Sequence, residues 1–171
     1  ADSYYHLNQK TEALVEYKKL SEIYGNPYME DALTRVAEIS YDNQDYQTAL
    51  DYFKRLQLQA STIDKINMAR LGVLRSAFLM NDNQTTINIA SQIIEDVASK
   101  TDVVNEALYN RAKAYINLNE YDLAINDLNK VANEVRSAQG AEAKYLLALL
   151  WFESGDIDKS ENEIMEFAAM N

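Results

Sequence analysis

The sequence predicts an all-α fold in which antiparallel helical hairpins stack into a solenoid. The composition favours helices, because the 171 residues include one Pro and four Gly. The sequence also repeats itself every 36 to 38 residues, a period typical of helical repeat proteins. Hydrophobic residues make up 47% of the chain, which is enough to form a buried core.

The repeat is clearest in residues 32–56 and 107–131, which align without a gap. Each segment has an alanine near the middle of a first helix, a polar turn, and a second helix with an early small residue. Weaker copies cover residues 69–93 and 143–167, and a partial copy begins the chain. The small residue of the second helix recurs at steps of 36, 37, 38 and 36 residues, at Ala13, Ala49, Thr86, Ala124 and Ser160.

The second helices carry small or apolar residues at positions i, i+4 and i+7, which lie on one face of a helix. Acidic residues stand where these helices begin and backbone N–H groups lack partners, at Asp45, Asp82, Glu120 and Asp156. Gly25, Asn26 and Pro27 mark another boundary, since Gly ends helices and Pro suits their first turn. We therefore predict helices near residues 9–24, 28–42, 46–59, 63–80, 84–98, 102–117, 121–136, 138–153 and 157–169.

These helices group into one solenoid over residues 1–171. Its repeats span about residues 1–27 (partial), 28–64, 65–101, 102–138 and 139–171. We expect the chain to be a piece of a longer repeat protein, because the partial copy lacks a full first helix. In the last helix Ser160, Ile164 and Phe167 form a packing stripe, which we expect another helix to cover. Neighbouring repeats of the longer chain, or self-association through the 157–170 helix, would provide that helix.

The small residues in the first and second helices, with the apolar pair behind them, resemble the tetratricopeptide repeat. In the first helices these small residues are Ala37, Ala112 and Ala148. The resemblance covers essentially the whole chain and implies a right-handed superhelix that acts as a protein–protein interaction module. The sequence departs from the family pattern at three positions. The pattern prefers Gly or Ala at the position of Leu74, an aromatic residue at that of Ala90, and Leu at that of Arg111.

The period exceeds the family's typical length of about 34 residues. Longer repeats of this kind are similar to those of bacterial cell-envelope tetratricopeptide proteins, including outer-membrane assembly lipoproteins. That resemblance implies a periplasmic location. The absence of cysteine is compatible with any redox compartment.

The resemblance also places a partner-binding surface on the concave side, along the first helix of each hairpin. Its candidate residues are Thr34, Glu38, Tyr41, Leu71, Arg75, Phe78, Tyr109, Lys113, Ile116, Tyr145, Leu149 and Phe152. The apolar and aromatic members suit a peptide or a helix, and Phe78, Tyr109, Tyr145 and Phe152 are the expected anchors. The alternative is that these side chains pack as core, and that the chain is a structural spacer or assembly scaffold without a ligand groove.

Two candidate residues, Arg75 and Lys113, are cations in an acidic chain. They either orient an acidic or C-terminal group of the partner, or they are solvated or paired with Glu38 and Glu106.

Other functions find no support in the sequence. The net charge of −11 disfavours nucleic acid, and the longest apolar run, Tyr145 to Phe152, is too short to span a bilayer. The spacing around the single histidine, His6, implies no catalytic group of Ser, Cys or Asp. The acid-rich stretches Asp42–Asp45 and Asn81–Asn83 lack the Gly and the bidentate Glu of a calcium loop. We expect a non-enzymatic protein without cofactor or metal, in which Trp151 packs in the core.

Overall fold

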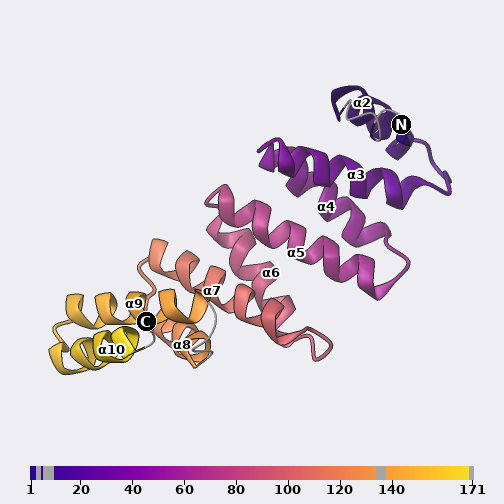
Figure 1. Ribbon diagram of the computed structural model, residues 1–171. Coiled ribbons are helices and arrows are strands. Elements are labelled where there is room, and N and C mark those ends of the chain that lie inside the picture. Colours follow the sequence, from indigo (N-terminus) through magenta and orange to yellow (C-terminus); the bar gives the residue numbers. More distant parts are fainter. Residues whose placement is uncertain (3–4, 6–9, 134–137, 170–171) are drawn as a thin grey trace. The chain divides into compact units, whose positions relative to one another are not determined.

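The structure, a computed structural model, describes residues 1–2, 5, 10–133 and 138–169 (Figure 1). All regular elements of this part are α-helices, as the sequence predicts. The helices are α2 (Lys10–Ser21), α3 (Met29–Asp42), α4 (Tyr46–Gln59), α5 (Ile63–Leu79), α6 (Asn83–Glu95), α7 (Thr101–Asn117), α8 (Tyr121–Ala132), α9 (Ala138–Glu153) and α10 (Ile157–Ala169).

Most predicted helix ends agree with the structure, but α2 and α6 each end three residues earlier than expected. After α2, the Asn26 side-chain amide donates to the carbonyl of Leu20, which turns the chain before Pro27. After α6, the Asp96 side chain accepts from the N–H of Ala98 and forms a local turn. The predicted extension of α8 over residues 134–136, and His6, lie outside the described residues.

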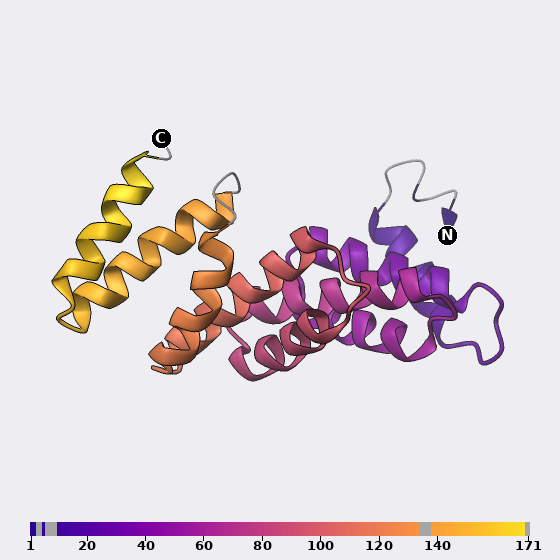
Figure 2. The same cartoon turned by 90° about the horizontal axis from the view of Figure 1, so that it is seen from below.

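The chain forms two compact units, Ala1–Asp82 and Asn83–Asn171. In the first unit α2 packs on α3, α3 on α4, and α4 on α5; in the second, α6 to α10 pack in the same consecutive way (Figure 2). Contacts also join α3 to α5 and α7 to α9. Consecutive first helices therefore lie side by side within each unit, which is the arrangement that a repeat-protein surface needs.

Each turn from a first helix to a second has the same backbone geometry. Its central residue has a positive φ, between 57° and 84°, at Gln44, Asn81, Asn119 and Gly155. In the first of these turns Gln44 N–H donates to Tyr41 O and Asp45 N–H donates to Ser40 O, both at 2.9 Å. The other three turns have the equivalent pair of bonds. This pairing is the Schellman motif, which ends the first helix and satisfies its last carbonyl groups.

The acidic residue after each turn begins the second helix. Asp45 accepts a hydrogen bond from the Thr48 N–H at 3.2 Å, and Asp156 accepts one from the Lys159 N–H at 3.3 Å. These bonds satisfy backbone donors at the helix start. For Asp45 the contact with Thr48 lowers the pKa of the carboxyl. Glu120 occupies the equivalent place but makes no such bond.

The recurring small residues of the second helices are all buried, as the repeat predicts. None is more than 3% exposed: Ala13, Ala49, Thr86, Ala124 and Ser160. Small side chains let two helices approach closely, and Ser160 also donates its hydroxyl to the carbonyl of Ala148 at 2.9 Å. The period in the sequence therefore marks the packing contact of each second helix.

An ion pair joins α7 to α8 in the second unit. Arg111 donates Nε to Asp127 Oδ2 at 2.7 Å and Nη2 to Asp127 Oδ1 at 2.9 Å, while its Nη1 reaches Ser91 Oγ at 2.8 Å. The Asp127 side chain is 1% exposed. This pair explains the departure from the family pattern at Arg111, because a buried carboxylate needs a hydrogen-bonded cation where the pattern has Leu.

Candidate partner-binding surfaces

The candidate residues of α3 and α5 line one groove in the first unit. The groove has a volume of about 220 Å³ and is lined by Glu38, Tyr41, Asp42, Phe53, Met68, Leu71, Gly72 and Arg75. Four of these eight residues, Glu38, Tyr41, Leu71 and Arg75, belong to the predicted surface. We call this site the α3–α5 groove.

The floor of the α3–α5 groove depends on a glycine inside α5. A Cβ atom on Gly72 would lie 2.5 Å from the ring of Phe53, a buried residue of α4. The absence of a side chain thus allows the α5 backbone to reach the aromatic ring. An isolated Gly in the middle of a predicted helix is the sequence signal that could have revealed this site, since Gly is costly there without a packing reason.

The acidic residues of the α3–α5 groove form ion pairs with basic side chains of α2 and α3. Glu38 accepts from Arg35 Nη1 at 3.1 Å, and Asp42 accepts from Lys10 Nζ at 3.1 Å. These pairs are partly exposed, so they contribute little to stability. The groove therefore has an apolar floor and a charged rim in which both signs are present.

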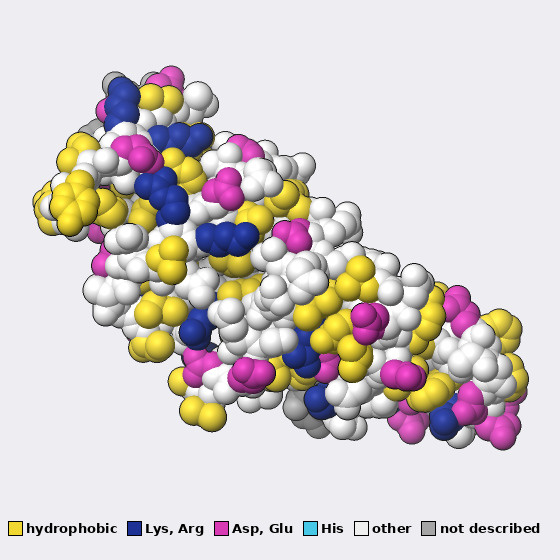
Figure 3. Space-filling view, turned by 180° about the vertical axis from the view of Figure 1, so that it is seen from behind, with side chains coloured by type: hydrophobic (Ala, Val, Ile, Leu, Met, Phe, Trp, Pro, Cys, Tyr) yellow, Lys and Arg dark blue, Asp and Glu magenta, His cyan; other side chains and the backbone are white. Residues whose placement is uncertain are grey.

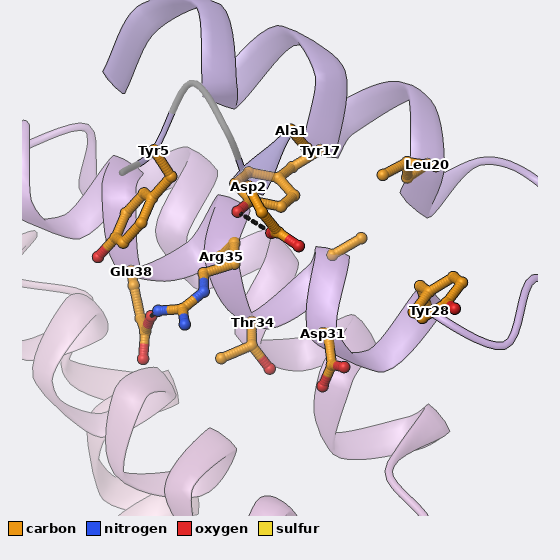
Figure 4. A pocket seen from close by; sticks show the side chains of 11 residues that line it. Ala1, Asp2, Tyr5, Tyr17, Leu20, Tyr28, Asp31, Thr34, Arg35 and Glu38 are labelled. Carbon is orange, nitrogen blue, oxygen red and sulfur yellow. Dashed lines mark hydrogen bonds and ion pairs between the residues drawn. The ribbon is translucent and has the colours of Figure 1, made fainter. Parts of the chain in front are cut away.

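A second hollow lies between α3, α2 and the start of the chain (Figure 4). It has a volume of about 510 Å³, and Glu38 lines both this hollow and the α3–α5 groove. Arg35 lies 4.8 Å above the ring of Tyr5, and Tyr17 donates its hydroxyl to Asp2 at 2.6 Å. Burial and this hydrogen bond raise the pKa of Tyr17 to about 12. Thr34 is the other predicted residue here, and its hydroxyl donates to the carbonyl of Glu30.

In the second unit the candidate residues of α7 are mostly covered. Tyr109 is 8% exposed and belongs to the hydrophobic core, so the expectation that it is an exposed anchor is wrong. Burial and a hydrogen bond with Glu142 raise the pKa of its hydroxyl. Lys113 lies 5.3 Å above the Tyr109 ring with its Nζ 3.8 Å from Glu142. Ile116 is partly buried against the same core.

The candidate residues of α9 are open to solvent. Tyr145 is 56% exposed, Leu149 41% and Phe152 63%. We call these three residues the α9 stripe. Phe78 of α5, the remaining candidate, is partly buried at the end of its helix. The aromatic row predicted from the sequence is therefore exposed on α9, while its members on α3, α5 and α7 are partly or fully buried.

The described residues contain no group of three or more His, Cys, Asp or Glu side chains that could hold a metal ion. The helices within this part of the chain are also too short or too polar to cross a membrane. Trp151 packs partly buried against the core, with Lys159 Nζ 4.2 Å from its ring centre.

Comparisons with known proteins agree with this architecture. Residues 106–133, which include most of α7 and all of α8, match the family model of the tetratricopeptide repeat. The structure resembles the crystal structure of MamA with a TM-score of 0.77 and 17% sequence identity, over 99% of this chain and 92% of that chain. No curated protein sequence matches the chain significantly. Residues 106–133 are therefore similar to a tetratricopeptide repeat, and the fold of the described residues is similar to that of MamA.

Proposed function

We propose that the chain binds a peptide or a helix of a partner protein along the first helices of its hairpins. Tetratricopeptide repeats serve in general as protein–protein interaction modules. The finer assignment, that the partner lies on the residues of α3, α5 and α9, is our proposal.

The α3–α5 groove is the observation that carries the proposal. Its volume of about 220 Å³ is smaller than the roughly 300–1,000 Å³ of pockets for small molecules. A groove of this size suits one side chain of a partner. The Phe53 ring and Leu71 would contact an apolar group, while the charged rim would orient the partner's backbone or polar side chains.

The alternative function, a structural spacer, predicts that the aromatic residues of the α9 stripe are buried. A spacer needs its aromatic residues in the core, and exposed ones lower its solubility. Tyr145 and Phe152 are more than half exposed, which favours a binding module over a spacer.

A second contact surface is proposed on α10. On α8 the packing residues Ala124, Leu128 and Val131 are completely buried, whereas Ile164, at the place of Leu128, is 54% exposed. Met165 beside it is 65% exposed. We expect a helix of a neighbouring repeat, or of a second copy of this chain, to cover this side of α10.

The groove can be tested by selecting peptides from a random display library on the intact protein. Selected peptides are then measured against Met68→Ala/Leu71→Ala, which removes two apolar groups from the α3–α5 groove. Leu58→Ala is the matched control, since Leu58 is an exposed apolar residue of α4 outside the groove. We expect the groove variant to weaken binding by about tenfold, equivalent to about 1.4 kcal/mol, and the control to leave it unchanged. Equal binding by wild type and a folded groove variant would contradict the proposal.

A further inference from the structure

We infer that the α9 stripe binds a basic amphipathic helix of the partner protein. The inference rests on the proposed function and adds the chemistry of the partner at this surface.

The α9 stripe has the spacing of a helix-binding surface. Tyr145, Leu149 and Phe152 stand at positions i, i+4 and i+7, so they point to one side of α9 over about 10 Å of its length. All three are exposed to solvent, and two are aromatic. Aromatic residues bury a large area with little loss of side-chain entropy, which makes them effective anchors. A partner helix would match them with its own apolar residues at i, i+4 and i+7.

The charges around the α9 stripe select the partner. Glu142 precedes the stripe by three residues and Glu153 follows it by one, and both are exposed. Glu153 makes no ion pair with any residue that the structure describes, whereas Glu142 has Lys113 Nζ at 3.8 Å. A carboxylate at each end of an apolar stripe attracts a helix that carries Lys or Arg at both ends of its apolar side.

The one basic residue of α9 points away from this surface. Lys144 is 7% exposed and forms ion pairs with Glu163, at 3.5 Å, and with Glu166, both on α10. The Lys144 ammonium group is therefore neutralised by two carboxylates of α10 and lies between α9 and α10. The solvent-exposed side of α9 therefore carries negative charge and no positive charge among its described residues.

The charge of the second unit reinforces this selection. Residues 83–171 contain seven Lys and Arg and fifteen Asp and Glu, a balance of −8, whereas residues 1–82 contain nine and twelve, a balance of −3. In the space-filling view, acidic side chains are frequent over the half that carries the last helices (Figure 3, right). Such a field increases the association rate of a basic partner.

Fluorescence anisotropy with synthetic peptides would test the inference on the intact protein. The probe is a labelled helical peptide with Leu at i, i+4 and i+7 and Lys at both ends of this apolar side. Two analogues keep the leucines and replace the lysines by Gln or by Glu. The test variant is Tyr145→Ala/Phe152→Ala. The control variant is Leu118→Ala/Leu123→Ala, which removes two exposed apolar groups of the second unit that lie outside α9 and α10.

We expect the Lys peptide to bind at least about tenfold more tightly than the Glu peptide, and Tyr145→Ala/Phe152→Ala to weaken it by about tenfold or more. The control variant should bind it like the wild type. Glu153→Gln should reduce the preference for Lys and leave binding of the Gln peptide unchanged.

Two results would overturn the inference. If all three peptides bind equally through Tyr145 and Phe152, the stripe is a binding surface without charge selection, and the proposed function stands. If the Lys peptide binds the two double variants equally, its attraction is unspecific and the stripe is not its site. The proposed function is tested separately, by measuring the display-selected peptides against the groove variant Met68→Ala/Leu71→Ala.

Discussion

The ring of Phe53 in α4 lies against the backbone of Gly72 in α5, so closely that a Cβ atom on Gly72 would stand 2.5 Å from the ring carbons Cγ and Cδ1. Phe53 is 6% exposed and cannot swing away into solvent. This contact joins α4 to α5 within the first unit and forms the floor of the α3–α5 groove.

We predict that Gly72→Ala destabilises the protein. Forcing an extra methyl group into this contact lowers the free energy of unfolding by about 1–3 kcal/mol. The better helix propensity of Ala offsets about 0.8–1.0 kcal/mol of this loss. A net loss of up to about 2 kcal/mol is expected in denaturant unfolding followed by circular dichroism. In the background of Phe53→Leu, which removes the ring, the same Gly72→Ala change should cost less. Higher stability of Gly72→Ala alone, or an equal effect of Gly72→Ala with and without the Phe53 ring, would contradict the close contact.

We predict that Arg111 and Asp127 are strongly coupled. Asp127→Ala leaves the guanidinium of Arg111 without its bidentate partner, and loss of one member of a buried pair costs about 3–5 kcal/mol. Arg111→Leu should also destabilise the protein, because it leaves the buried Asp127 carboxylate with only the exposed Lys130, whose Nζ is 3.8 Å from Oδ1. The double variant Arg111→Leu/Asp127→Leu should recover most of the loss, since a well-packed apolar pair can replace a buried ion pair. Additive losses in this double-mutant cycle, measured by thermal unfolding, would show that the two side chains act independently.

We predict that the Asp45 cap stabilises α4 and that its contribution disappears in acid. The folded state lowers the pKa of Asp45 below its ordinary value of 3.8, chiefly through the hydrogen bond with Thr48. Its contribution is therefore present above pH 3.8 and is lost as the pH falls through the folded pKa. Asp45→Ala should cost about 1 kcal/mol at pH 7. Asp45→Asn keeps an effective cap, so its stability relative to wild type should improve between pH 5 and about pH 2. A constant difference over this range would contradict the assignment.

We predict that Tyr109 and Tyr145, which occupy equivalent positions on α7 and α9, respond differently to substitution. Tyr109→Ala opens a cavity in the core and should cost about 3–5 kcal/mol. Tyr109→Phe keeps the ring, loses the hydrogen bond with Glu142, and should cost about 1 kcal/mol. Tyr145→Ala should change the free energy of unfolding by less than about 0.5 kcal/mol, because the side chain is mostly exposed. Equal losses for the two Ala variants would mean that the α9 stripe is part of the core.

We predict that the exposed side of α10 mediates association. Sedimentation velocity of the wild-type chain at increasing concentration should show a reversible shift to a larger species. Ile164→Glu/Met165→Glu should abolish the shift because it adds like charges to an already acidic helix. Leu58→Glu, at an exposed apolar position of α4, serves as the control and should leave it unchanged. A wild-type chain that stays monomeric at every concentration would rule out self-association. A helix of a neighbouring repeat would then remain as the proposed cover of α10.

Local sequence determined the helices and the turns between them. The small residue of each second helix is visible in the 36- to 38-residue period, and every one of these residues is buried. The acidic residue at each turn was equally visible, because helix starts require hydrogen-bond acceptors within a few residues. Helix ends were less predictable at α2 and α6, where the side chains of Asn26 and Asp96 compete for backbone groups.

Only the tertiary structure decided which residues of the predicted surface reach solvent. A helical period places Tyr109 and Tyr145 at the same position of their helices, yet Tyr109 is buried beside Glu142 while Tyr145 is exposed. Burial depends on the helix that packs opposite, which the spacing within one helix does not specify. The same reason explains Gly72 and the ion pair between Arg111 and Asp127. Each acquires its role from a residue more than fifteen positions away along the chain, so its role follows from packing between helices.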